Sequence, residues 1–449
     1  MKHFVHRAPP RGLVKNFAFR ACGGETHIHK LTKTDRFTGS SLKKTPMNAD
    51  SPKQRATPPD SGKFHLPNLP LAWWQAQAAE RDGGHGLCNI PMKAPKTVKY
   101  IVAGLALSSF ALAPSLRAQT TEVFFVGANA SQNILYDQAS NVLNGGTITA
   151  AISSTNSTVR DYTGTIAGQP SLGTVTIHFS LLGGIEGLQD LANQNDELTA
   201  GGTGLAPTVV VSSASPGAVG LSASGFTVLG PTLVVPYAFI IYPAAPLMAG
   251  VTNLTQRQAA YLEGAAGTNS AGSLPISFFG GTSTNPIYLV ARNTASAVRT
   301  ETDANIYFTG TISTWTTNSA GQPVPDPSGG QSSGSNVRAL VKAIGNAIGT
   351  VAASDISSDT PLAYEGVPYS ITNVENGTYP LWGFENYYYN TGNGAPSAAQ
   401  YQVITNFFSG VTNATYQTTS SLFVGNFAPL SGMQVTRTTD GGPITLITY

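Results

Sequence analysis

Short apolar runs alternate with amphipathic stretches along the chain from residue 121 onward. Residues 121–127 have the pattern of a strand that ends at a glycine, and 129–143 place apolar side chains at helical spacing after good capping residues. The same order recurs at 174–179, which alternates like a strand, and at 181–188, which turns into a helix. Strands that alternate with helices predict an α/β fold, in which a mixed or parallel sheet is flanked by helices.

The pattern continues with a long apolar strand at 233–243 and a capped helix at 251–264 that a glycine stops. Two segments interrupt it. Residues 198–217 are rich in Gly, Ser and Thr and are predicted as a loop, and 317–334 as a disordered surface insertion. The remaining predicted elements are strands at 288–292 and 346–352, and helices at 335–344 and around 401–408.

The first 118 residues differ from the rest. Residues 1–91 are basic, rich in Pro and Lys and without a sustained hydrophobic period, so they are predicted not to fold alone. Residues 92–118 have a cationic start, an apolar core and a small residue, Ala118, before Gln119, which is typical of a secretory signal peptide. The apolar core is about a dozen residues, shorter than the roughly 20 that span a membrane. We therefore expect a bacterial periplasmic or secreted protein without a membrane span after cleavage near Ala118.

Signal peptides stand at the N-terminus, so an internal one needs a reason. We expect translation to start at Met92, with 1–91 a mis-annotated upstream extension. The alternative is a real cytoplasmic tail followed by an uncleaved anchor. N-terminal sequencing of the exported protein separates the two.

Charge is distributed unevenly. Residues 1–118 hold 18 of the 25 Lys and Arg, which leaves 7 basic against 17 acidic residues in 119–449, a net charge of −10. Nucleic acid and anionic lipid are poor partners for such a chain. Both cysteines, Cys22 and Cys88, precede residue 119, so thiol chemistry is excluded beyond it. A single histidine there, His178, without a Cys, His or carboxylate cluster beside it, predicts an inter-strand structural role. No enzyme, cofactor or metal site is expected.

Arg292 is the candidate residue that stands out in this acidic chain. It closes the apolar run 286–291, and a short turn with Ser296 leads into a polar, helix-compatible stretch. A guanidinium beside the free N–H groups of a helix start is suited to hold an oxyanion. The rival interpretations are a surface or ion-pair role for Arg292, and a helix-capping role for Ser131 after the first predicted strand.

Five short motifs occur in an order that resembles one family. They resemble the type II periplasmic solute-binding proteins, in the phosphate-binding branch of ABC importers. The motifs are Gly127-Ala-Asn-Ala-Ser131, Asn253-Leu-Thr255 through Gly264 after the strand that begins near Val235, Arg292 with Ser296, Asn346-Ala-Ile-Gly349, and Tyr379-Pro-Leu381.

The resemblance implies a two-lobed type II periplasmic binding protein fold, with mixed sheets flanked by helices and hinge strands between the lobes. Lobe 1 would comprise 119–236 and 381–449, and lobe 2 would comprise 237–380. Phosphate or a related small oxyanion would bind in the cleft for delivery to an ABC permease. A carboxylate in the family usually accepts the phosphate's own proton and excludes fully deprotonated oxyanions. The implied ligand-binding residues are Ala130, Ser131, Gln132, Arg292, Ser296 and Ala297.

The chain also departs from the family's site. Ala297 and Val298 replace a Gly and a Thr, and Leu182 replaces a Ser before a glycine pair. The expected acidic residue is Ala223 or Ser224, depending on register. Each hydroxyl lost costs about 1–3 kcal/mol of binding if a ligand oxygen is left unpaired. The alternative function is therefore a secreted or surface-associated structural or adhesive protein with the same fold and a non-functional cleft.

Overall fold

The computed structural model describes residues 120–448, except 144–148, 155, 266–273 and 393. The upstream extension predicted at 1–91 and the signal peptide predicted at 92–118 lie outside the described residues. None of the helices within the described ranges is both long and apolar enough to cross a bilayer.

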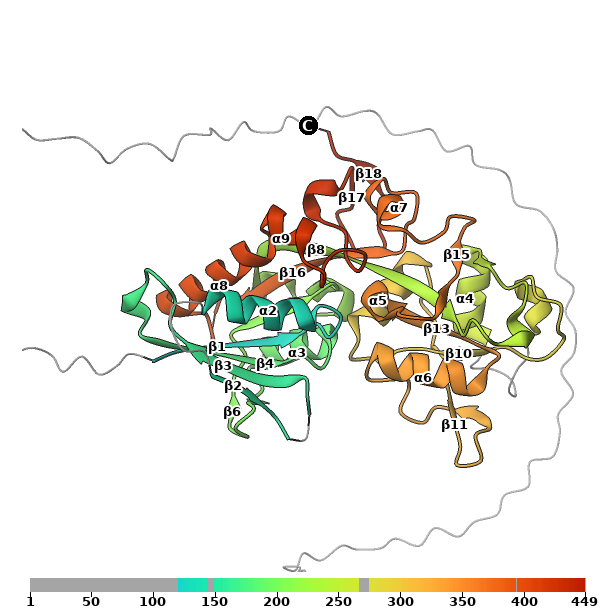
Figure 1. Ribbon diagram of the computed structural model, residues 1–449, viewed down its shortest axis with the longest axis horizontal. Coiled ribbons are helices and arrows are strands. Elements are labelled where there is room, and N and C mark those ends of the chain that lie inside the picture. The colour runs from blue at the N-terminus through green and yellow to red at the C-terminus, as the bar shows by residue number, and fades with distance from the viewer. Residues whose placement is uncertain (1–119, 144–148, 155, 266–273, 393, 449) are drawn as a thin grey trace, which may run out of the picture. The chain divides into compact units, whose positions relative to one another are not determined.

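A mixed sheet of ten strands organises the described part of the chain (Figure 1). Its order is β10-β13-β8-β16-β7-β1-β4-β3-β2, and β14 pairs with β8 outside this path. The α/β class, with a mixed sheet flanked by helices, is confirmed. These strands are β1 Thr120–Gly127, β2 Thr149–Ile152, β3 Val159–Gly164, β4 Thr174–Ser180, β7 Val209–Ser212, β8 Phe226–Ile241, β10 Tyr288–Val290, β13 Ala347–Ala352, β14 Thr360–Pro361 and β16 Trp382–Asn390.

Two groups of parallel strands are joined by a long antiparallel pair. β1 pairs in parallel with β4 and β7, β10 pairs in parallel with β13, and β8 and β16 run antiparallel between the groups. We call β1–β4 and β7 with their helices the first lobe, and β10 and β13 with theirs the second lobe. The helices are α2 Gln132–Val142, α3 Gly184–Asn193, α4 Gln256–Ala265, α5 Ala297–Asn305, α6 Gly334–Ile344, α7 Ile371–Glu375, α8 Ala398–Val411 and α9 Ala414–Thr419.

Helices cover the sheet because alternate residues of each strand point to opposite faces. On β1, Phe125 packs against Phe407 of α8, with ring centroids 4.6 Å apart, while Val126 lies in a buried cluster with Leu188 of α3. In the second lobe, α6 packs on β10 and β13. The remaining short strands are β5 Glu197–Leu198, β6 Gly204–Leu205, β9 Asn253–Leu254, β11 Trp315–Thr317, β12 Pro323–Pro325, β15 Ala363–Tyr364, β17 Val435–Thr436 and β18 Thr445–Leu446.

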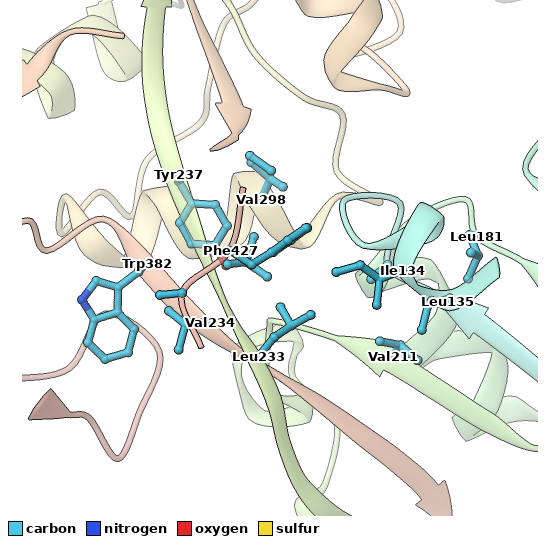
Figure 2. Close-up of a cluster of buried hydrophobic side chains, with 14 of the residues drawn as sticks. Ile134, Leu135, Leu181, Val211, Leu233, Val234, Tyr237, Val298, Trp382 and Phe427 are labelled. Atoms are coloured by element: carbon cyan, nitrogen blue, oxygen red, sulfur yellow. The ribbon is translucent and has the colours of Figure 1, made fainter. Parts of the chain in front are cut away.

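One hydrophobic cluster continues from the first lobe into the second. It contains Ile134 of α2, Leu233 of β8 and Val298 of α5 (Figure 2). Trp382, at the start of β16, belongs to the same cluster and is fully buried. The starts of α2 and α5 are therefore anchored on a shared core that crosses β8.

Two sequence-based predictions about irregular segments are wrong. Residues 198–217 do not form a simple loop, because Val209–Ser212 is strand β7, buried between β1 and β16. Residues 317–334 contain most of an antiparallel hairpin, β11 with β12. Both segments are rich in Gly, Ser and Thr, but the valines of β7 pair with the distant strands β1 and β16, while β11 and β12 pair locally with each other.

Helix α8 offers a test of local stability, because it begins with a capping box. Ser397 Oγ accepts a hydrogen bond from Gln400 N, and Gln400 Oε1 accepts one from Ser397 N, at 3.3 and 2.9 Å. We expect Ser397→Ala to lower the free energy of unfolding by about 1 kcal/mol, measured by urea denaturation. Ser409→Ala, at an exposed position inside the same helix, is the matched control and should not lower it. Equal losses at both positions would contradict the capping role.

Candidate functional site

A small cavity lies where three helices begin. Helices α2, α3 and α5 have Ser131, Gly183 and Ser296 as their N-cap residues, and neither serine side chain caps its helix with a hydrogen bond. The cavity volume is about 10 Å³, room for about one water molecule. It is lined by Ala128, Asn129, Ala130, Gly183, Gly184, Ser213, Arg292, Ser296, Ala297, Val298 and Glu385.

The three helix starts give the cavity a positive potential. The first N–H groups of a helix have no acceptor inside that helix, and the helix dipole places partial positive charge at the same end. Each of the three helices has nine or more residues, so each has a developed dipole. Their convergence favours an anion over a cation in the cavity.

Arg292 adds a full positive charge at the same place. It follows β10, its side chain is 2% exposed, and it has no ion-pair partner among the described residues. Burial lowers the pKa of its guanidinium to about 10, although the charge of Asp355 opposes that shift. The guanidinium therefore stays protonated at neutral pH. The expectation of a surface or ion-pair arginine does not describe its position.

Two backbone carbonyl groups accept hydrogen bonds from the Arg292 side chain, and one guanidinium nitrogen, Nη1, is left without a partner among the described residues. Nε donates to Gln331 O at 3.2 Å, and Nη2 donates to Ser332 O at 2.9 Å. Nη1 is buried and has no hydrogen-bond partner within the described residues. The backbone approaches closely here: Gly330 has φ +128°, and a Cβ on it would lie 2.4 Å from Arg292 O. The segment predicted as a disordered insertion thus fixes the arginine.

Glu385 is a second ionisable residue of the cavity, one that sequence reasoning missed. It lies on β16 with 1% exposure, and its Oε2 accepts a hydrogen bond from Ser131 Oγ at 2.8 Å. Its Oε1 is buried without a described partner. Burial raises the pKa of the Glu385 carboxyl to about 8, although the hydrogen bond from Ser131 opposes the rise. At neutral pH this carboxyl is mostly a neutral acid.

The cavity is closed by contacts between the lobes. Ile185 N donates to Ala295 O at 3.1 Å, and Ser354 Oγ donates to Ala130 O at 3.1 Å. Glycine is required on the α3 side, because a Cβ on Gly183 would lie 2.2 Å from Ala295 O. A ligand larger than a water molecule therefore needs these contacts to open before it can enter.

The structure brings most of the predicted ligand-binding residues together. Four of the six line the cavity: Ala130, Arg292, Ser296 and Ala297. Ser131 is not among the lining residues, but its hydroxyl group donates a hydrogen bond to Glu385, which lines the cavity. Gln132 is not among the lining residues, and its Oε1 accepts from Asn129 Nδ2 at 3.4 Å. The glycine pair that follows Leu182 lines the cavity through its backbone.

His178 has a carboxylate neighbour that its sequence surroundings did not reveal. Its Nδ1 lies 2.9 Å from Asp161 Oδ1, across the pairing of β4 with β3. Asp161 Oδ1 also accepts from Ala200 N at 3.2 Å. Asp161 is a single carboxylate that comes from the adjacent strand, so the sequence next to His178 does not reveal it. The contact links two strands, as an inter-strand role requires.

Three carboxylates near α3 lie close enough to share a cation. Glu186, Asp190 and Glu197 each offer one oxygen atom, and these atoms lie within 4.8 Å of one another. Burial raises the pKa of Glu197 to about 7, and Ser180 Oγ donates to it at 2.8 Å. A proton held by Glu197 relieves the mutual repulsion of this cluster without a metal ion.

Comparisons with known proteins give remote structural matches. No protein-family model matches the sequence, and no curated protein matches it. One similar solved structure is described as a phosphate ABC transporter substrate-binding protein with bound phosphate, from Clostridium perfringens. The match has 16% identity and a TM-score of 0.46, and it covers 69% of this chain and 100% of that chain. A phosphate transport receptor from Vibrio cholerae has 16% identity and TM-score 0.41 over 64% and 93%. The CcmR regulatory domain from Synechocystis, in complex with 2-PG, has 10% identity and TM-score 0.38 over 66% and 99%. Likenesses this distant assign no ligand to the chain.

Proposed function

We propose that the cavity is the closed form of a binding site for a small tetrahedral oxyanion, phosphate or a relative such as sulfate. The observation that carries the proposal concerns Arg292, which lines a cavity where three helices begin and whose Nη1 is a buried cationic donor without a partner among the described residues. A buried donor that lacks an acceptor costs free energy, so the arrangement favours an occupant that accepts hydrogen bonds.

The site would use neutral donors and one charge. Arg292 Nη1, the N–H groups at the starts of α2 and α5, and the hydroxyl group of Ser296 would surround the anion. Charge-assisted hydrogen bonds of this kind are strong in a dry cavity. The protein would then be an exported solute-binding protein that delivers the anion to an ABC permease, and it would have no catalytic task.

One observation favours the alternative of a structural or adhesive protein. The closed cavity holds about one water molecule, and hydrogen bonds between the lobes, such as Ile185 N to Ala295 O, keep it shut. If these contacts never open, the donors of the cavity would serve only a bound water molecule. Ligand titration separates the two functions.

The experiment is a calorimetric titration of the purified full-length chain with phosphate, with sulfate and with chloride, paired with thermal unfolding. Binding of phosphate or sulfate should release or absorb heat and raise the melting temperature. At a ligand concentration 100 times Kd, binding should add about 2.7 kcal/mol to the free energy of unfolding. Chloride should compete only weakly. The absence of heat and of a melting shift with every anion would favour the structural alternative.

A further inference from the structure

Glu385 has an unusual position for a carboxyl group in an anion site. Glu385 is only 1% exposed, and it lines the same cavity as Arg292. The two do not form an ion pair within the described residues. Arg292 therefore does not neutralise Glu385, and an ionised Glu385 would repel any anion that enters.

The proton of a neutral Glu385 has a defined place. Oε2 is occupied as an acceptor by Ser131 Oγ, at 2.8 Å. Oε1 is buried and has no partner in the described part of the chain. The acid form would carry its proton on Oε1, the carboxyl oxygen that remains free to meet a ligand.

The surroundings of Glu385 favour the neutral form. Tyr237 of β8 and Tyr387 of β16 are its titratable neighbours, and both are fully buried. Glu301 of α5, Asp440 and the cationic Arg437 also act on Tyr237. Ser131, the N-cap residue of α2, donates a hydrogen bond to the carboxyl, and Arg292 lines the same cavity. Burial raises the pKa of Glu385 to about 8, and the hydrogen bond from Ser131 opposes that rise.

We infer that Glu385 determines the specificity of this site: it meets the ligand as a carboxylic acid and donates its Oε1 hydrogen to an oxyanion that carries no proton, such as sulfate. This inference rests on the proposed function. In the phosphate-binding family that the sequence resembles, a carboxylate accepts the ligand's proton and rejects such anions. Here the proton would come from the protein, so a fully deprotonated oxyanion would be accepted.

The inference makes anion affinity depend on pH in a stated direction. Well below pH 8 Glu385 holds its proton and sulfate affinity is highest. Around pH 8 affinity begins to fall, and well above it affinity falls about tenfold per pH unit, because Glu385 must take up a proton before it can donate one to sulfate. Sulfate has no proton of its own over this range, which makes it the suitable probe. Between pH 6.5 and 9.5 we expect sulfate affinity to fall about 30-fold.

The test compares the wild-type chain with Glu385→Gln by calorimetric titration of sulfate at pH 6.5, 8 and 9.5. The amide copies the neutral acid, with a donor in place of O–H, so the variant should bind sulfate within about threefold of wild type at pH 6.5 and should lack the Glu385-dependent fall. Any loss of charge on Arg292 near pH 9.5 would occur in both proteins and cancels in the comparison. Thermal unfolding at each pH verifies that both remain folded.

Each outcome bears on a different claim. Parallel pH profiles for the two proteins, or a wild-type profile that stays flat, would overturn the inference and leave the anion site intact. Binding of phosphate without binding of sulfate at pH 6.5 would also overturn it. If neither protein binds sulfate or phosphate at any pH, the proposed function itself fails.

Discussion

Replacement of Arg292 by glutamine is expected to weaken phosphate and sulfate binding by at least about 30-fold. Removal of one partner from a buried, hydrogen-bonded charge pair costs about 2–5 kcal/mol, and 1.4 kcal/mol corresponds to a factor of ten in Kd. Arg292 carries the only basic charge that lines the cavity among the described residues. The measurement is calorimetric titration of each variant at pH 6.5.

Two further variants make this result specific. Arg292→Lys keeps the charge but loses the planar fork that reaches Gln331 O, Ser332 O and the ligand together, so it should bind with intermediate affinity. Arg257→Gln removes a charge from an exposed position of α4 and should leave affinity unchanged. Wild-type affinity in Arg292→Gln would contradict the assignment of Nη1 to the ligand.

The largest loss of stability is expected from Trp382→Ala. The indole of Trp382 is fully buried at the start of β16, packs edge-on against Phe384, and lies 3.9 Å below the guanidinium of Arg437. Its truncation leaves a cavity in the shared core and removes the face on which a buried cation rests. We expect the free energy of unfolding to fall by about 3–5 kcal/mol in urea denaturation.

Controls for this prediction use the same chain. Trp382→Phe should lose less, which keeps the comparison measurable if the alanine variant does not fold. Tyr307→Ala removes an aromatic ring that is 71% exposed and should change stability by less than about 0.5 kcal/mol. Equal effects of Trp382→Ala and Tyr307→Ala would show that the core around β16 does not support the fold as described.

The regular elements could be predicted where the hydrophobic period is strong. The strand at 121–127 and the helix that follows it have such a period, and both occur as β1 and α2. The prediction failed at β7, because a run of three valines inside a Gly- and Ser-rich stretch becomes a central strand only through β1 and β16. Partners that lie far away in sequence decide such segments.

The cavity shows the same limit. The spacing from Arg292 to Ser296 identified two lining residues, because a strand end, a turn and a helix start are neighbours in the chain. Glu385 could not be found in this way, since it meets Ser131 across 254 positions of sequence. The available signal was an isolated carboxylate in an aromatic strand, Trp382 to Tyr389, where burial without a partner is costly.

The prediction for 317–334 failed for a related reason. Its composition indicates a flexible surface segment, yet the carbonyl groups of Gln331 and Ser332 hold the Arg292 side chain. Backbone acceptors carry no sequence signature, so side-chain patterns cannot reveal them. The close approaches of Gly330 to Arg292 O and of Gly334 to the Asp355 carboxylate do require glycine there.

The most direct test of the anion site is a crystal structure of the full-length chain grown with selenate, a tetrahedral anion whose selenium gives an anomalous signal. We predict one anomalous peak in the cavity, with a selenate oxygen at hydrogen-bond distance from Arg292 Nη1 and another facing Glu385 Oε1. The lobe contact from Ile185 N to Ala295 O should lengthen or re-form around the anion. A cavity that holds only water at saturating selenate, with Arg292 Nη1 bonded to that water, would contradict the account.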